Sequence, residues 1–169
     1  MLKSDTVNTT VKKTAWSWFL LSGVLVLLDQ ISKWWVVKHI RFGEFLDLFP
    51  SLSLTLTYNT GIAFSLFSQY AMLGRILLIT FTSFISLVIA LWLAQTPRDE
   101  KWNKAALALI LGGAVGNLLD RVVYGHVIDF IDFYIKSWHW YTFNLADSFI
   151  TVGALMTIKS LIFSNENSK

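Results

Sequence analysis

Residues 76–94, ILLITFTSFISLVIALWLA, decide the fold, because this run contains no charged side chain. A helix needs about 20 mostly apolar residues to cross the hydrocarbon core of a bilayer. Arg75 precedes the run, and the polar segment 95–104 (QTPRDEKWNK) follows it. We therefore expect a transmembrane helix over about 75–94.

Three further apolar windows predict transmembrane helices over about 14–37, 104–122 and 143–163. The 169-residue chain is 54% hydrophobic and only 15% charged, which excludes disorder, collagen and repeat arrays. The first window is too long for a cleaved signal peptide and lacks an Ala-x-Ala site. We expect one all-α integral membrane domain over 1–169, with four spans.

The distribution of Lys and Arg predicts the orientation of these spans. Eight of the fourteen lie in the N-terminal arm, the 95–104 loop and the C-terminal tail, which share one side of the membrane. Short cytoplasmic segments carry such an excess of positive charge. Both termini are therefore expected in the cytoplasm.

The first loop on the other side, about 40–70, contains an alternation of apolar and hydroxylated residues over 51–57 (SLSLTLT). A period of two indicates a β-strand. Because one strand is not stable alone, we expect a small β-sheet in this loop, followed by a turn at 58–61 (YNTG).

Composition also limits the chemistry. The chain has no cysteine, which excludes disulfides, a thiol nucleophile and Cys-ligated metal sites. Its net charge of +3 is spread over loops, so no basic stripe indicates binding to nucleic acid.

Charged residues within the spans need a partner or a purpose. Asp29 and Lys33 are four apart, hence on one helix face, and form either an ion pair or a contact to substrate. If they pair, removal of Asp29 is expected to leave Lys33 without a partner. Asp120 and Arg121 follow a glycine-rich run, 112–117, which favours close helix packing.

Asp129 and Asp147 are the most informative pair. We place Asp129 at the end of the third element and Asp147 at the start of the fourth, so that an outer loop brings the two carboxylates to similar depth. Two close carboxylates in a low-dielectric site share a proton, as in aspartic proteases, and can activate water. The alternative is that each one caps a helix or strand through backbone N–H groups.

Other constellations are weaker. His126, Asp129, Asp132 and His139 match no standard metal spacing. The G-x-S-x-G element is absent, and the proximity of Asp29 argues against a Ser/Lys dyad built on Lys33. A proton-coupled transporter remains the alternative from another class, although no span is interrupted by proline and no inverted repeat is evident.

Five motifs in register give the chain a family resemblance. They are Asp29-Gln30-x-x-Lys33, Tyr58-Asn59-Thr60-Gly61-x-Ala63-Phe64, Gly112-Gly113-Ala114-x-Gly116-Asn117-x-x-Asp120-Arg121, Val127-Ile128-Asp129-Phe130 and Phe143-Asn144-x-Ala146-Asp147-Ser148. In these motifs the chain resembles the bacterial lipoprotein signal peptidases, signal peptidase II, from the first span to the fourth.

The resemblance implies an aspartyl endopeptidase of the bacterial inner membrane, acting near the periplasmic face, with no cofactor or metal. Its substrates would be diacylglyceryl-modified prolipoproteins, cut just before the lipidated cysteine, and it would contact membrane lipid. We expect a monomer, because nothing in the sequence demands a second subunit. Asp129 and Asp147 would be the catalytic dyad. Substrate-binding or dyad-supporting roles are implied for Asn59, Gly61, Ala63, Asn117, Arg121 and Asn144, and structural roles for Asp29, Lys33 and Asp120.

Overall fold

The computed structural model describes residues 4–61 and 71–164. Its helices are α1 (Ser4–His39), α2 (Ala71–Gln95), α3 (Lys101–Val123) and α4 (Leu145–Ser164). Its strands are β1 (Phe45–Phe49), β2 (Leu52–Asn59), β3 (Val127–Ile135) and β4 (Trp138–His139). Each helix contains a segment that is long and apolar enough to span a membrane: Trp16–His39, Met72–Gln95, Lys101–Val123 and Leu145–Phe163. The expectation of four spans and a small sheet is confirmed.

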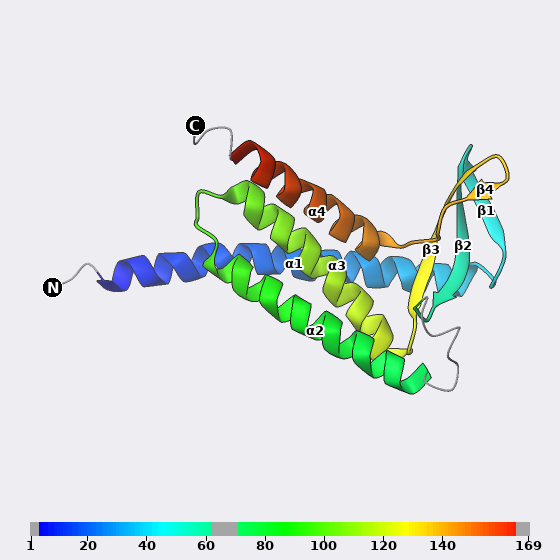
Figure 1. Cartoon of the computed structure of the whole chain (residues 1–169), viewed down its shortest axis with the longest axis horizontal. Helices are drawn as coiled ribbons and strands as arrows, with labels where there is room; N and C mark the ends of the chain where they lie inside the picture. The colour runs from blue at the N-terminus through cyan, green and yellow to red at the C-terminus, as the bar shows by residue number, and fades with distance from the viewer. Residues whose placement is uncertain (1–3, 62–70, 165–169) are drawn as a thin grey trace.

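α3 is the central helix of the bundle. It packs against α1, α2 and α4, whereas the described parts of α2 and α4 make no contact with each other. In its most apolar window 56% of the residues are buried, against 11% in each of α2 and α4. Figure 1 shows α2 and α4 on opposite sides of α3, with the sheet across one end of the bundle. The start of α1 and the end of α4 lie at the other end.

Glycines allow the helix backbones around α3 to approach closely. A Cβ on Gly116 of α3 would lie 2.6 Å from the Asp29 carboxylate of α1, and one on Gly112 would lie 2.8 Å from Leu25. Across the α3–α4 contact, a Cβ on Gly153 would lie 2.6 Å from the Ala106 carbonyl oxygen. Without a hydrophobic driving force between helices in lipid, such close packing holds them together. The packing interpretation of the glycine-rich run is correct.

The sheet is antiparallel, with the strand order β1-β2-β3-β4. It differs from the expectation in one respect, because β3 and β4 come from the second outer loop rather than the first. β2 pairs along one edge with β1 and along the other with β3, where Thr57 lies opposite Asp129. A two-stranded hairpin is marginal in water, so the third strand is what stabilises it.

The placement of Asp129 at the end of the third helix was wrong. α3 ends at Val123, and the chain turns through Gly125, whose φ of 84° is readily adopted only by glycine. The Arg75 side chain of α2 covers this turn: its Nε donates to the Arg121 carbonyl (3.1 Å) and its Nη2 to the Val122 carbonyl (2.9 Å). The chain then enters β3, which carries Asp129.

A small apolar core fixes the sheet to the end of α1. Val36 of α1 and Ile40, just after its end, pack with Leu56 of β2 and with Ile128 and Phe130 of β3. All five side chains are buried. The position of β3, and therefore of Asp129, is set by this contact.

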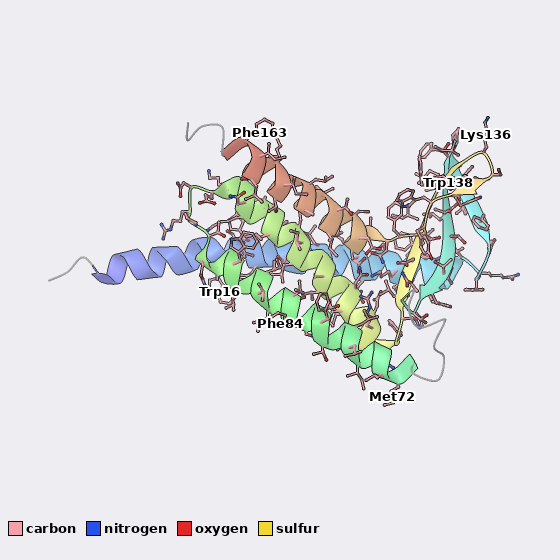
Figure 2. The ribbon with its side chains drawn as sticks, viewed as in Figure 1. Trp16, Met72, Phe84, Lys136, Trp138 and Phe163 are labelled. Carbon is pink, nitrogen blue, oxygen red and sulfur yellow. The ribbon has the colours of Figure 1, made fainter. Side chains whose placement is uncertain are left out.

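The outside of the bundle is apolar. Figure 2 shows the side chains that cover it, among them Trp16 and Phe84, which are 72% and 62% exposed. Exposed apolar surface on this scale is not found on soluble monomers. Lipid is the expected surrounding of these helices.

Replacing Gly153 by alanine is expected to destabilise the fold by about 1–3 kcal/mol, because the new methyl group overlaps the α3 backbone. The matched control is Gly23→Ala, since nothing lies within 4 Å of a Cβ at that position of α1. Thermal denaturation of the detergent-purified proteins measures the difference. Equal melting temperatures for the two variants would contradict the close α3–α4 packing.

Candidate active site

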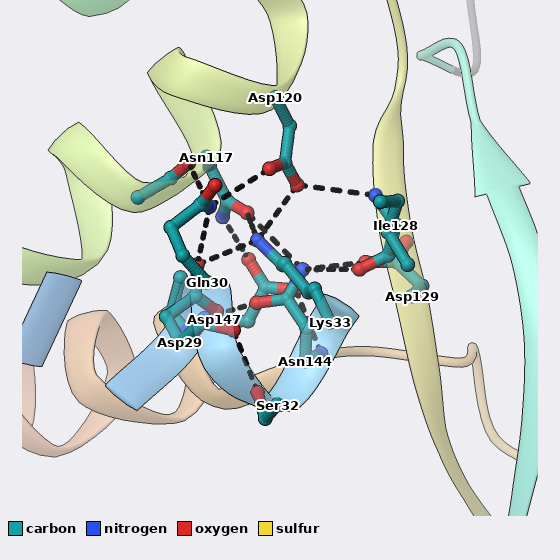
Figure 3. A network of polar contacts seen from close by, with 12 residues as sticks. Asp29, Gln30, Ser32, Lys33, Asn117, Asp120, Ile128, Asp129, Asn144 and Asp147 are labelled. Atoms are coloured by element: carbon teal, nitrogen blue, oxygen red, sulfur yellow. Dashed lines mark hydrogen bonds and ion pairs between the residues drawn. The ribbon is translucent and has the colours of Figure 1, made fainter. Parts of the chain in front are cut away.

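The site is a network of polar side chains where α1, α3, β3 and the start of α4 meet (Figure 3). Asp129 projects from β3, and Asp147 lies in the first turn of α4. Asp129 is 2% exposed, and Asp147 is half-buried. The structure therefore brings the two predicted carboxylates into one network, although one is carried by a strand rather than by a helix end.

Asn144 connects the two carboxylates. Its Nδ2 donates to Asp129 Oδ1 (2.6 Å), while its Oδ1 accepts the Asp147 backbone N–H (2.9 Å). The Asn144 N–H in turn donates to Asp147 Oδ2 (3.3 Å). This reciprocal pattern is a capping box, in which Asn144 satisfies a free N–H at the start of α4. Because Asn144 is fully buried, one amide fixes both aspartates.

The side chain of Asn117 of α3 also bonds to Asp147 and Asn144. Its Nδ2 donates to Asp147 Oδ1 (2.7 Å). Its Oδ1 accepts hydrogen bonds from Asn144 Nδ2 (3.1 Å) and from Lys33 Nζ (3.0 Å). The amide orientation is thereby determined, since the ammonium of Lys33 can only donate.

Asp29, Lys33 and Asp120 form a buried ion cluster next to this network. Lys33 Nζ is 2.8 Å from Asp29 Oδ2 and 2.8 Å from Asp120 Oδ2, and all three side chains are at most 1% exposed. The predicted Asp29–Lys33 pair is present, but Asp120 is a second partner. Gln30, which the sequence motif contained without an assigned role, donates to Asp120 Oδ1 (2.9 Å) and to Asp29 Oδ2 (3.2 Å).

The cluster also holds the backbone next to each catalytic candidate. Asp29 Oδ1 accepts the N–H of Ala146, the residue before Asp147, at 3.0 Å. Asp120 Oδ2 accepts the N–H of Ile128, the residue before Asp129, at 3.2 Å. Hydrogen bonds to ionised acceptors are about twice as strong as neutral ones. Asp29 and Asp120 therefore each hold the backbone beside one of the two aspartates.

Asp129 faces a cavity of about 280 Å³ at the sheet end of the bundle, lined also by Asn59, Gly61 and Tyr141. Asn59 Nδ2 donates to Asp129 Oδ2 (2.9 Å), and Asn59 Oδ1 accepts the Gly61 N–H (2.9 Å). The pKa of Asp129 is raised from 3.8 to about 6, chiefly by burial and also by the charge of Asp147. The hydrogen bonds from Asn59 and Asn144 oppose this rise.

The remaining predicted residues divide into two groups. Arg121 Nη1 donates to the Asn117 carbonyl (3.2 Å), and its guanidinium interacts electrostatically with Asp147, Asp129 and Asp120. The structure therefore places Arg121 beside this network. Ala63 lies outside the described residues.

The alternative metal site is not assembled. Asp132 and His139 do meet, with Asp132 Oδ2 2.8 Å from His139 Nδ1 and 3.0 Å from Ser53 Oγ. Asp129 instead bonds to asparagines, and within 4–61 and 71–164 no three His, Cys, Asp or Glu side chains form a metal-binding group. The Ser/Lys alternative also fails, because Lys33 bonds to two carboxylates and an amide.

Comparisons with known proteins point to one family. A family model described as signal peptidase (SPase) II matches residues 21–163. A lipoprotein signal peptidase of Coxiella burnetii is 40% identical over 156 residues, covering 92% of this chain and 96% of its own. One from Pseudomonas syringae pv. tomato is 41% identical, covering 96% and 94%. A bacterial membrane enzyme solved by the in meso method superposes with a TM-score of 0.78 at 27% identity, covering 90% of this chain and 92% of that chain.

Because the ion cluster has two carboxylates, replacing Lys33 is expected to destabilise the protein more than replacing Asp29. The Asp29–Lys33 pair alone would not predict this difference. Asp29→Asn leaves Lys33 paired with Asp120, so Lys33 is not stranded. Lys33→Met instead leaves two buried carboxylates without their cation, at an expected cost of about 3–5 kcal/mol. Thermal denaturation in detergent compares the two variants. A larger loss of stability in Asp29→Asn would contradict the shared pairing.

Proposed function

The chain belongs to the signal peptidase II family, and we propose that it removes the signal peptides of lipoproteins by aspartic catalysis with Asp129 and Asp147. That it is a membrane peptidase follows from the family. The observation that supports the aspartic mechanism is Asn144, whose side-chain amide donates to the Asp129 carboxylate and whose backbone N–H donates to the Asp147 carboxylate. Asp129 is also accessible to a substrate through the cavity that it lines.

The surroundings of the two aspartates give them different roles. Burial keeps the proton on Asp129 below about pH 6. Asp147 lies at the N-terminal end of α4, where the helix dipole favours an ionised carboxylate, and it accepts a hydrogen bond from Asn117. We therefore assign Asp147 as the base and Asp129 as the acid at rest, a division of labour typical of paired carboxylates in unlike environments.

The reaction then follows from this assignment. The Asp147 carboxylate takes a proton from a water molecule, whose oxygen forms a bond to the scissile carbonyl carbon, while Asp129 gives its proton to the carbonyl oxygen. When the tetrahedral intermediate collapses, the C–N bond breaks and the amine nitrogen takes the proton that Asp147 holds. Asp129 recovers its proton from the hydroxyl group as the carbonyl re-forms. Asn59 and Asn144 hold the acid in place throughout.

We also propose the substrate and the membrane topology of the enzyme. The substrate is a diacylglyceryl-modified prolipoprotein cut before its lipidated cysteine, as the family resemblance implies. The cavity lies at the sheet end, and the start of α1 and the end of α4 lie at the other end. With the termini in the cytoplasm, as the positive-inside rule predicts, we propose that the cavity lies at the periplasmic face of the inner membrane. Nothing in the mechanism requires a second subunit, so we propose a monomer.

Asp129→Asn and Asp147→Asn are each expected to lower cleavage by at least about a thousandfold, because each removes one half of the proton transfer. The matched control is Asp132→Asn, a buried aspartate on the same strand whose carboxylate, among the described residues, bonds to Ser53 and His139 and not to the dyad. A gel-shift assay with lipidated prolipoprotein in detergent measures turnover. Near-normal cleavage by either dyad variant, in the presence or absence of a chelator, would refute the aspartic assignment.

The pH profile tests the role of Asp129 as the acid. Since its pKa is raised to about 6, kcat/KM is expected to fall as pH rises through that value and the proton is lost. Asn59→Ala removes a hydrogen bond that lowers this pKa, so the fall should move to higher pH.

Thr57→Val is the control for this experiment. Thr57 Oγ1 bonds the Asp129 backbone carbonyl and not its carboxylate, so the profile should stay in place. A profile that moves to lower pH in Asn59→Ala, or does not move, would show that another group sets the alkaline limb.

A further inference from the structure

A second cavity, of about 380 Å³, lies at the sheet end of the bundle between α1, α3 and the strands. It is larger than the cavity that contains Asp129. Its lining residues are Gln30, Lys33, Trp34, Val37, Tyr58, Asp120, Tyr124, His126 and Ile128. Neither the dyad nor the proposed mechanism uses this space.

The lining favours an apolar occupant. Its three ionic or amide side chains, Gln30, Lys33 and Asp120, already bond to one another and leave no free charge for a ligand. The other walls are aromatic or aliphatic, and Trp34 and Val37 are 61% and 44% exposed on the surface of α1. Both belong to the membrane-spanning part of α1. A hydrocarbon chain can therefore enter from the bilayer.

The same cavity also offers hydrogen-bond donors. Among the described residues, the hydroxyl groups of Tyr58 and Tyr124 and the imidazole of His126 have no hydrogen-bond partner. The His126 ring packs against Tyr58, with 4.5 Å between ring centroids. An acyl chain that ends in an ester carbonyl provides an apolar body and an acceptor for such donors.

The position of the cavity identifies the source of that chain. Tyr58 lines both cavities, so a single side chain lies between them. Ile128 lines the second cavity, and the next residue, Asp129, lines the first. On the proposed function, the diacylglyceryl group is attached to the residue immediately after the scissile bond, so its chains start beside Asp129.

We propose that this second cavity, next to the catalytic one, binds one acyl chain of the diacylglyceryl group of the substrate, with Tyr58 and Tyr124 as donors to its ester. The inference rests on the proposed function, since it requires that the substrate be lipidated. It explains how the enzyme distinguishes a lipidated cysteine from an unmodified one: part of the binding energy comes from a site that only the lipid reaches.

Filling the cavity tests the proposal. Val37→Trp narrows it from the α1 side, whereas Ile31→Trp adds the same bulk at a membrane-exposed position of α1 that does not line it. With a dipalmitoyl substrate, Val37→Trp should raise KM by at least about tenfold and leave kcat within about twofold. With a dioctanoyl substrate the increase should be smaller. Equal KM values for the two variants, or an equal increase for both substrates, would overturn the acyl-chain site.

Photolabelling separates the substrate from bilayer phospholipid as the source of the chain. A substrate with a diazirine on one acyl chain should label peptides that contain Trp34, Val37 or Tyr124, and a diazirine phospholipid in the same nanodisc should not. Labelling by the phospholipid that substrate does not displace, or no labelling by either probe, would overturn the proposal. The readout does not depend on the dyad: if cleavage persisted in Asp129→Asn, the aspartic mechanism would fail while the labelling could still succeed.

Discussion

The ammonium of Lys33 is the constraint on which the rest of the structure depends. A cation within a membrane-spanning helix is tolerated only if it is paired and its hydrogen bonds are satisfied. Asp29 and Asp120 provide the charge, and Asn117 accepts the third hydrogen bond. The need to satisfy one buried charge therefore fixes α1 against α3 and determines the orientation of an amide that touches Asp147.

That cluster connects directly to the chemistry. Each of its carboxylates accepts one backbone N–H just before a catalytic candidate, so the framework and the dyad share hydrogen bonds. Asp129 and Asp147 then differ in their immediate surroundings. Asp129 is a buried residue of strand β3, and Asp147 lies at the N-terminus of helix α4. Such a difference distinguishes a preferred acid from a preferred base.

Much of this arrangement was predictable from the sequence. The four spans follow from hydropathy, and the Asp29–Lys33 pair follows from helical spacing. The position of Asp129 on a strand was not predicted, because the run 127–135 (VIDFIDFYI) is too apolar to show a clear period of two next to a transmembrane segment. Asp120 as a second partner of Lys33 depends on helix packing across 87 residues of sequence, and no local pattern reports it. The dual role of Asn144 likewise depends on where β3 lies against α4.

The central claim is that the buried Asp129 carboxyl holds its proton up to about pH 6 and acts as the acid. Carbon-13 NMR of detergent-solubilised protein with side-chain carboxyl-labelled aspartate measures this directly over pH 4–8. We expect one carboxyl resonance that titrates near pH 6 and disappears in Asp129→Asn. A resonance near pH 6 that instead disappears in Asp147→Asn, or the absence of any aspartate that titrates above pH 5, would contradict it.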